Sequence, residues 1–343
     1  MKRELPLLRG SERGDFKTCQ WQWWQAWRMG YANPKPKTDA LWFGGGIHLA
    51  LAHYYQPQGK GPLRGFKRGP DPMETWQKFC KLERPRFFRK GEPGDLEEKE
   101  YIAYEDLGSA MLEGYVDYWE GDPAWEFLAP EMPFSVLVPD HEGNPLLNFV
   151  GTWDGAARDH SRDGEIILVE TKTTKAISTR HLILDPQSGG YDLVADTMLH
   201  HTGLLPPGES VRYIVYNFLR KAMPDQRPTN PEGFYINKDG TISKRQPPAY
   251  YLRHPVERSR AEKQSVLNGL INESLQMQQI RDGTVQLTKN PGFLGENCRR
   301  CDFAEMCELH EQGGDYEEFA QNFLVQCDPY ADHRPDAKSS KFL

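Results

Sequence analysis

The stretch EIILVETKTT (residues 165–174) decides the fold class, because a run of apolar residues leads directly into two charged ones. Such a run is typical of a central strand that is buried on both faces and carries polar residues at its C-terminal end. Side chains alternate along a strand, so Glu170 and Lys172 are predicted to lie on the same face. The sequence therefore predicts a buried strand that ends in a charged pair.

The segments around this strand predict an α/β fold. FSVLV (134–138) and LLNFVGTWDGAA (146–157) are typical of two preceding strands, and VRYIVYNFL (211–219) of a later one. A helix is predicted between them at 187–200. The order strand, strand, strand, helix, strand indicates a mixed sheet with helices packed on it.

The rest of the chain is predicted to be largely helical. Helices are expected at 19–30, 44–56, 96–120 and about 255–281, and the last thirty or so residues are expected to be loosely held. The expected organisation is an N-terminal helical part (1–56), a basic insertion with a helical region (57–125), a core (126–222), a C-terminal helical part (223–310) and a polar tail (311–343).

Two adjacent predicted strands carry the candidate chemistry. If their hairpin pairs in register, Asp154 reaches the end of the sheet where Glu170 and Lys172 lie. Carboxylates suit Mg²⁺ or Mn²⁺, and a metal held there can activate water against a phosphodiester. A surface ion pair of Glu170 with Lys172, and Asp154 as a turn residue, is the alternative. Glu131, just before the first strand, is a further candidate for organising the site.

The cysteines suggest a second centre. Cys298, Cys301 and Cys307 have the spacing C-x2-C-x5-C, one ligand short of a four-thiolate site. Six cysteines in 343 residues do not resemble the dense framework of a small secreted domain, so reduced thiols or metal ligation are expected rather than disulfides. Cys80 and Cys327 lie outside the pattern and are expected to be plain thiols.

Charge is distributed unevenly along the chain. The formal net charge is −7, yet residues 60–90 contain ten Lys or Arg against three Asp or Glu, a local excess of +7. A surface that pairs with phosphates and stacks bases has this composition, whereas a solvated loop offset by the acidic residues that follow is the equal alternative. The candidate DNA-binding residues are Arg84, Arg86, Phe87, Phe88, Arg89 and Lys90.

The motifs in this order resemble the PD-(D/E)xK nucleases, specifically their RecB-like exonuclease branch. The matching segments are GGGIHLALAHYY with His48, GTWDG with Asp154, VETKTT with Glu170 and Lys172, and QSGGY with Gln187 and Tyr191. The resemblance implies a restriction-endonuclease-like core in which Asp154, Glu170 and Lys172 are catalytic. It also implies a metal held by His48, Asp154, Glu170 and the backbone carbonyl of Thr171, with Gln187 and Tyr191 near DNA or orienting the lysine.

Iron–sulfur members of this branch have one cysteine near the N-terminus and three after the core. The resemblance therefore implies a 4Fe-4S cluster held by Cys19 together with Cys298, Cys301 and Cys307. A four-cysteine zinc site would satisfy the same residue types. Either centre would close a loop of roughly 280 residues and stabilise the fold as a long-range cross-link does.

The resemblance implies a metal-dependent DNA exonuclease for single-stranded or frayed ends, acting in recombination, repair or replication. A CRISPR adaptation nuclease that trims spacer precursors and a catalytically inactive iron–sulfur DNA-binding module are the alternatives. The chain has no G-x-x-x-x-G-K-[ST] motif, so a helicase, recombinase or single-strand annealing protein is the candidate partner. No signal-peptide or membrane-length apolar run is present, and we expect a cytoplasmic protein of a bacterial cell or phage-infected host.

Overall fold

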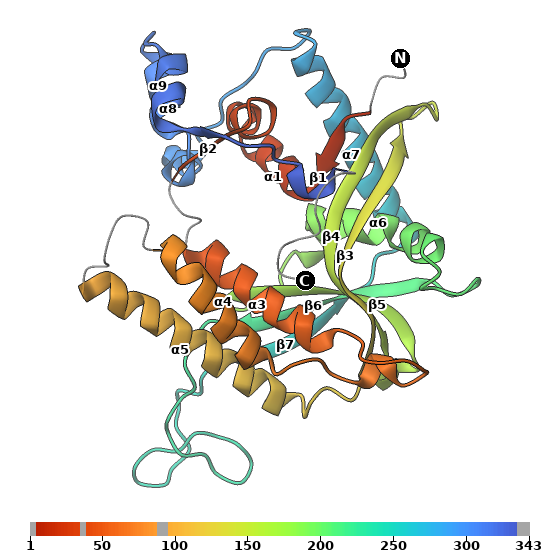
Figure 1. The fold of residues 1–343 in the computed structure, drawn as a ribbon, viewed down its shortest axis with the longest axis vertical. Coiled ribbons are helices and arrows are strands. Elements are labelled where there is room, and N and C mark those ends of the chain that lie inside the picture. Colours follow the sequence, from red (N-terminus) through yellow and green to blue (C-terminus); the bar gives the residue numbers. More distant parts are fainter. Residues whose placement is uncertain (1–4, 35–38, 88–94, 335–343) are drawn as a thin grey trace.

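The computed structural model describes residues 5–34, 39–87 and 95–334, and places a mixed sheet between two groups of helices (Figure 1). The expected mixed α/β architecture is confirmed. The six strands of the sheet are β1 (Leu7–Arg9), β3 (Trp125–Pro139), β4 (Pro145–Asp159), β5 (Glu165–Thr174), β6 (Val211–Arg220) and β7 (Tyr251–Val256). A separate pair joins β2 (Tyr31–Ala32) to β8 (Val325–Gln326).

Strand β4 organises the sheet because three strands pair with it. β3 runs antiparallel along the whole of one edge. The other edge is shared, since β1 pairs in parallel with residues 148–150 and β5 pairs antiparallel with residues 155–159. β6 then lies parallel to β5, and β7 antiparallel to β6. Residues 151–154 therefore lie at a fork, between the part of β4 that pairs with β1 and the part that pairs with β5.

Each face of the sheet is covered by its own group of helices. One core contains side chains of α1 (Gly10–Thr18), α6 (Pro186–His201) and α7 (Arg260–Arg281). The opposite core contains α3 (Asp39–Tyr55), α4 (Pro72–Phe87) and α5 (Asp95–Tyr118). Ile166 and Leu168 belong to the first core, and Ile167 and Val169 to the second. This division confirms that residues 165–174 form a central strand buried on both faces.

Several predicted boundaries differ from the structure. β3 begins at Trp125 rather than at 134, and the expected helix at 255–281 begins only at Arg260 because β7 occupies the preceding residues. The helix expected at 19–30 consists of α2 (Gln20–Trp23) and a π-helical turn (Trp24–Arg28). β1 and β7 extend the sheet beyond residues 126–222, because strands from both ends of the chain pair with the central ones.

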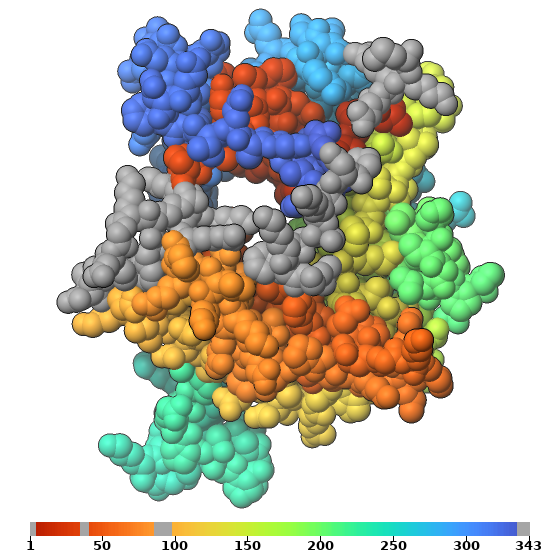
Figure 2. All heavy atoms as spheres, viewed as in Figure 1, coloured from red at the N-terminus to blue at the C-terminus, as the bar shows by residue number. Residues whose placement is uncertain are grey.

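The C-terminal segment packs against the N-terminal helices, so the expectation of a loosely held tail is wrong for residues up to 334. It contains α8 (Ala304–Glu311) and α9 (Tyr316–Phe323). Tyr330 is buried and donates a hydrogen bond of 2.5 Å to the buried Glu12 carboxylate. In Figure 2 the N-terminal helices (red) and this segment (blue) lie together at the top of the molecule. None of the helices in the described ranges is long and apolar enough to cross a membrane.

Candidate active site

Asp154 lies where β4 and β5 separate. The last backbone pair joins Gly155 to Val169, so Asp154 and Glu170 are the next residues in register, as the predicted hairpin required. The Asp154 carboxylate spans the opening fork, because its Oδ2 accepts a hydrogen bond of 2.6 Å from the backbone N–H of Thr171. The amide of Thr171 thus fixes the direction of the carboxylate.

His48 reaches Asp154 from α3, on the neighbouring layer. Its Nδ1 lies 3.2 Å from Asp154 Oδ1. Gly44, one turn earlier on the helix, lies on the same side, and a Cβ atom there would be 3.4 Å from Thr173 Oγ1 of β5. A Cβ atom on Gly46 would instead lie 2.5 Å from the rings of Trp76 and Phe79, so this glycine allows α3 to pack closely against α4.

Glu131 completes a group of three potential metal ligands. The pairs Pro130 with Gly155 and Met132 with Trp153 place Glu131 opposite Asp154. One ligand atom from each of His48, Glu131 and Asp154 lies within 4.8 Å of the other two. Glu131 has a left-handed φ of 44°, which is costly for a residue with a side chain and concentrates at functional sites.

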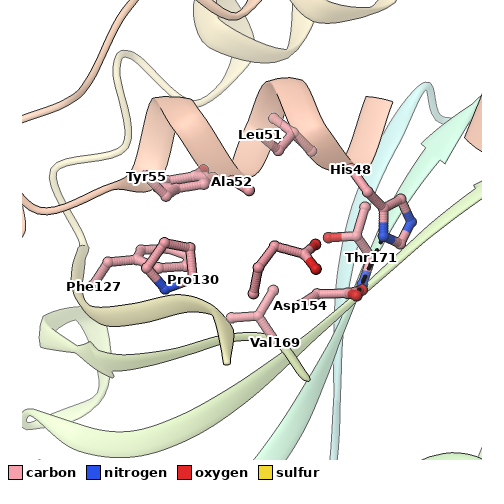
Figure 3. Close-up of a pocket in the computed structure, with 10 residues that line it drawn as sticks. His48, Leu51, Ala52, Tyr55, Phe127, Pro130, Asp154, Val169 and Thr171 are labelled. Atoms are coloured by element: carbon pink, nitrogen blue, oxygen red, sulfur yellow. Dashed lines mark hydrogen bonds and ion pairs between the residues drawn. The ribbon is translucent and has the colours of Figure 1, made fainter. Parts of the chain in front are cut away.

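A small pocket opens at this group of residues. It lies between α3, which contributes Leu51, Ala52 and Tyr55, and the strands that carry Phe127 and Val169. Figure 3 shows His48, Asp154 and Thr171 together at one side of the pocket, with the ring of Tyr55 at the other side. The pocket therefore has a polar end, where the potential ligands converge, and an apolar end.

Glu170 and Lys172 form a close pair on β5, as their alternation predicts. Lys172 Nζ lies 2.6 Å from Glu170 Oε1. The Glu170 side chain is only 5% exposed, whereas that of Lys172 is 36% exposed. The pair is therefore not a surface ion pair, since its carboxylate is buried and only the lysine side chain is partly exposed.

Burial and mutual charge divide the carboxylates of the site into two kinds. Burial opposes ionisation of Asp154, yet the pKa of Asp154 lies below its usual value. The main reasons are the charge of His48 and its hydrogen bond to Asp154, and the Thr171 amide and Lys172 add to them. Burial and the negative charge of Asp154 raise the pKa of Glu131 to about 7, and likewise that of Glu170. Although burial alone would lower it, the pKa of His48 rises to about 9 beside Asp154. A divalent cation would relieve the repulsion among the three carboxylates.

Gln187 and Tyr191 lie on the first turns of α6, near the Glu170–Lys172 pair. Gln187 Nε2 donates a hydrogen bond of 3.0 Å to the Tyr191 hydroxyl. Burial and then the charge of Glu170 raise the pKa of Tyr191. Asp185 caps the helix by accepting from the Gln187 N–H at 2.9 Å. The two predicted side chains therefore hold each other beside the buried glutamate, and neither extends into solvent alone.

The four predicted cysteine ligands, Cys19 near one end of the chain and Cys298, Cys301 and Cys307 near the other, lie near one another in the structure. Burial raises the pKa of Cys301 to about 11, and the charges of Cys19, Cys298 and Cys307 add to this rise. Cys19 and Cys307 pack against the same small core around Trp21. Among the described residues, no three of these sulfurs lie mutually within 4.8 Å of one another.

The predicted DNA-binding segment is only partly described. Arg84 forms an ion pair with Glu98, so its charge is partly offset. The side chains of Arg86 and Phe87, and all of Phe88, Arg89 and Lys90, lie outside the described residues.

A second pair of basic residues, which was not predicted from the sequence, lies near the site. Lys175 is exposed just beyond β5, and the Lys221 N–H donates to the Thr174 carbonyl at 2.7 Å. Burial and the charge of Lys175 lower the pKa of Lys221. In the described parts of the chain neither lysine forms an ion pair with an acid. Both lysines directly follow predicted strands, at the end of the sheet where Lys172 lies. This position in the sequence could have identified them as candidates.

A mixed sheet with Asp, Glu and Lys at a strand fork defines a nuclease with a restriction-endonuclease-like core. The sequence profile of the PD-(D/E)XK nuclease superfamily matches residues 11–308, and the chain belongs to this superfamily, whose members use divalent metals. A crystal structure of a candidate exonuclease from Eubacterium rectale superimposes with a TM-score of 0.44 at 10% identity, over 86% of this chain and 87% of that one. The search of curated proteins gave no significant match.

Proposed function

We propose that this protein is a metal-dependent DNA exonuclease of the RecB-like iron–sulfur branch, acting on single-stranded or frayed ends in recombination, repair or replication. The observation that carries the proposal is the convergence of His48, Glu131 and Asp154 within 4.8 Å, beside the Glu170–Lys172 pair at 2.6 Å. Family membership supplies the reaction class, hydrolysis of a phosphodiester. We place the protein in the cytoplasm, working beside a helicase, recombinase or annealing protein.

The residues present fit a divalent cation. Two carboxylates and an imidazole are suitable ligands for Mg²⁺ or Mn²⁺. Burial and then the negative charge of Asp154 raise the pKa of Glu131 to about 7, and a cation between the groups would offset both effects. We propose His48, Glu131, Asp154 and Glu170 as ligands, with the carbonyl of Thr171 as a further one. Since the pKa of His48 is raised to about 9 beside Asp154, its imidazole would release a proton to solvent when it ligates the cation. When bound, the metal would stabilise negative charge on the phosphate and favour ionisation of a water molecule.

The protein side chains position the reactants around this metal. Asp154 remains ionised because His48 and the Thr171 amide hold it, so a ligand is ready at neutral pH. Lys172 remains charged, since the charge of Glu170 outweighs the effect of burial and raises its pKa. We propose that its partly exposed ammonium orients the attacking water and stabilises charge on the phosphate in the transition state. Gln187 and Tyr191 would hold the DNA strand or the lysine.

We propose that Cys19, Cys298, Cys301 and Cys307 hold a 4Fe-4S cluster. The proximity of four free thiols supports a four-thiolate centre. A tetrahedral zinc site would take the same four thiolates. The order of motifs shared with the iron–sulfur branch is what favours the cluster over a single zinc ion. The cluster would fix the C-terminal segment to the N-terminal helices.

Lys175 and Lys221 are our proposed phosphate contacts. Two neighbouring ammonium groups without an acidic partner among the described residues repel each other, and a phosphate between them would remove this repulsion. They lie at the end of the sheet where Lys172 lies, so a strand bound there would lead into the site. The segment from Arg84 to Lys90 remains a second proposed contact.

The test is digestion of linear DNA labelled at the 5′ or the 3′ end, beside circular single strands. We expect linear DNA to be degraded with Mg²⁺ or Mn²⁺, circles to resist, and EDTA to stop the reaction. Degradation of circles at the same rate would contradict the exonuclease mode. Absence of any cleavage under all metal conditions would contradict the proposed function.

A further inference from the structure

We propose that Ile183 and Leu184 form an apolar wedge that holds open the terminal base pair of a DNA end. The inference rests on the proposed nuclease function and concerns its substrate. Both side chains belong to a single 3-10 turn, Leu182–Leu184, on the loop from β5 to α6. Leu184 is 73% exposed and Ile183 37% exposed, whereas Leu182 packs into the core.

The turn lies next to the proposed site. The loop begins a few residues after Lys172, and Asp185, which follows the turn directly, contributes to the raised pKa of Lys172. Asp185 also caps α6, the helix that carries Gln187. An exposed leucine at this place would meet a strand whose phosphate lies at the metal site.

The backbone under the wedge is held rigidly from inside the protein. The side chain of Arg258 is completely buried and donates to the carbonyls of Leu182 at 3.1 Å and Ile183 at 3.2 Å. The same guanidinium donates to Ser188 Oγ at 2.8 Å, which ties the turn to α6. With two carbonyls of the turn held from inside the protein, Ile183 and Leu184 lie on its exposed side. Separating a base pair requires such a fixed support.

Charge near the wedge identifies nucleic acid as its partner. Lys175 and Arg180 are exposed on the same loop, and neither forms an ion pair within the described residues. Basic groups beside an exposed aliphatic pair match a phosphate backbone and an opened base step. Proteins that unstack DNA commonly insert leucine or isoleucine between bases, whereas platforms for single strands use aromatic rings. Aliphatic side chains therefore favour separation of a base pair over stacking on a single strand.

The test compares one labelled sequence in three forms: as a single strand, as a blunt duplex, and as a duplex with mismatched ends. Single-turnover rates are measured for the wild type and Leu184→Ser, with Leu137→Ser as the control, because Leu137 is an exposed leucine on β3. Opening one base-pair step is worth roughly a factor of ten. We expect Leu184→Ser to lower the ratio of duplex to single-strand cleavage about tenfold, and mismatched ends to restore it. The control should leave the ratio unchanged.

A second measurement reports base opening without cleavage. A fluorescent adenine analogue at the duplex end should brighten when the Asp154→Ala protein binds, and much less when Leu184→Ser is added to it. An unchanged cleavage ratio, an equal loss on all three substrates, or failure of the wild type to cut blunt duplex would overturn the wedge alone. Failure of the wild type to cut any substrate would overturn the proposed function together with the wedge.

Discussion

Glu131→Gln should stabilise the metal-free protein while weakening its hold on metal. The carboxylate lies opposite Asp154 and, with it, within 4.8 Å of His48. Burial and the charge of Asp154 raise the pKa of Glu131 to about 7. Glutamine keeps the shape of the side chain but has no charge, so it removes the repulsion and replaces an anionic ligand with a weaker, neutral one.

The size of the effect follows from the pKa. The folded protein keeps a proton on Glu131 that the unfolded chain loses above the usual glutamate pKa of 4.5. The free energy of unfolding therefore falls as pH rises from about 4.5 through about 7. A rise of the Glu131 pKa from 4.5 to about 7 lowers the free energy of unfolding above pH 7 by about 3 kcal/mol, relative to a glutamate with an unshifted pKa. We therefore expect Glu131→Gln to gain on the order of 2 to 3 kcal/mol at pH 8 and almost nothing at pH 4.5.

The assay is thermal unfolding in EDTA across this pH range, repeated with Mn²⁺ at pH 8. Metal at a hundred times its Kd would stabilise the wild type by about 2.7 kcal/mol, and the variant by clearly less. Glu232→Gln, at an exposed glutamate, is the matched control and should follow the wild type. The same pH dependence in wild type and Glu131→Gln would refute the reasoning, as would an undiminished response to Mn²⁺ in the variant.

Three further expectations concern other parts of the protein. Lys172→Ala should cut DNA about 100-fold to 1000-fold more slowly than the wild type but bind metal normally by calorimetry. Lys172→Arg should not restore the rate, because a planar guanidinium replaces a compact ammonium poorly. A normal rate in Lys172→Ala would place the chemistry elsewhere. Protein purified without oxygen should be brown, and Cys301→Ala should lose both the colour and stability; a colourless, zinc-containing wild type would contradict the cluster. Reversing Lys175 and Lys221 to Glu should weaken DNA binding and reduce its salt dependence, with Lys244→Glu as the control; an unchanged salt slope would show that they do not contact phosphates.

The central strand and its charged end were predictable because their signals are local. An apolar run of strand length can be recognised without its partners, and alternation alone assigns Glu170 and Lys172 to one face. The register of Asp154 was also within reach, since a short turn between two strands leaves few ways to pair them. The observed pair of Gly155 with Val169 confirms this expectation.

Other parts of the site depend on contacts between distant residues. Glu131 was expected just before a strand that in fact begins at Trp125, because nothing local shows that a left-handed residue continues within β3. Arg258 supports the turn at Leu182 from 76 residues away in the chain. β1 and β7 are short strands that depend on partners already in the sheet. Propensity and periodicity do not determine such positions.

The glycines of GTWDG contribute to the site through packing, in addition to Asp154 itself. A Cβ atom on Gly151 would lie 2.7 Å from the ring of Phe134, and one on Gly155 would lie 2.6 Å from the ring of Phe127. Both phenylalanines belong to β3, one in each core, so their rings hold β3 against β4 on both sides of Asp154. This packing fixes the strand that carries Glu131 opposite Asp154. The distance between the two carboxylates, and hence the affinity for a cation, therefore depends on two positions that have no functional group at all.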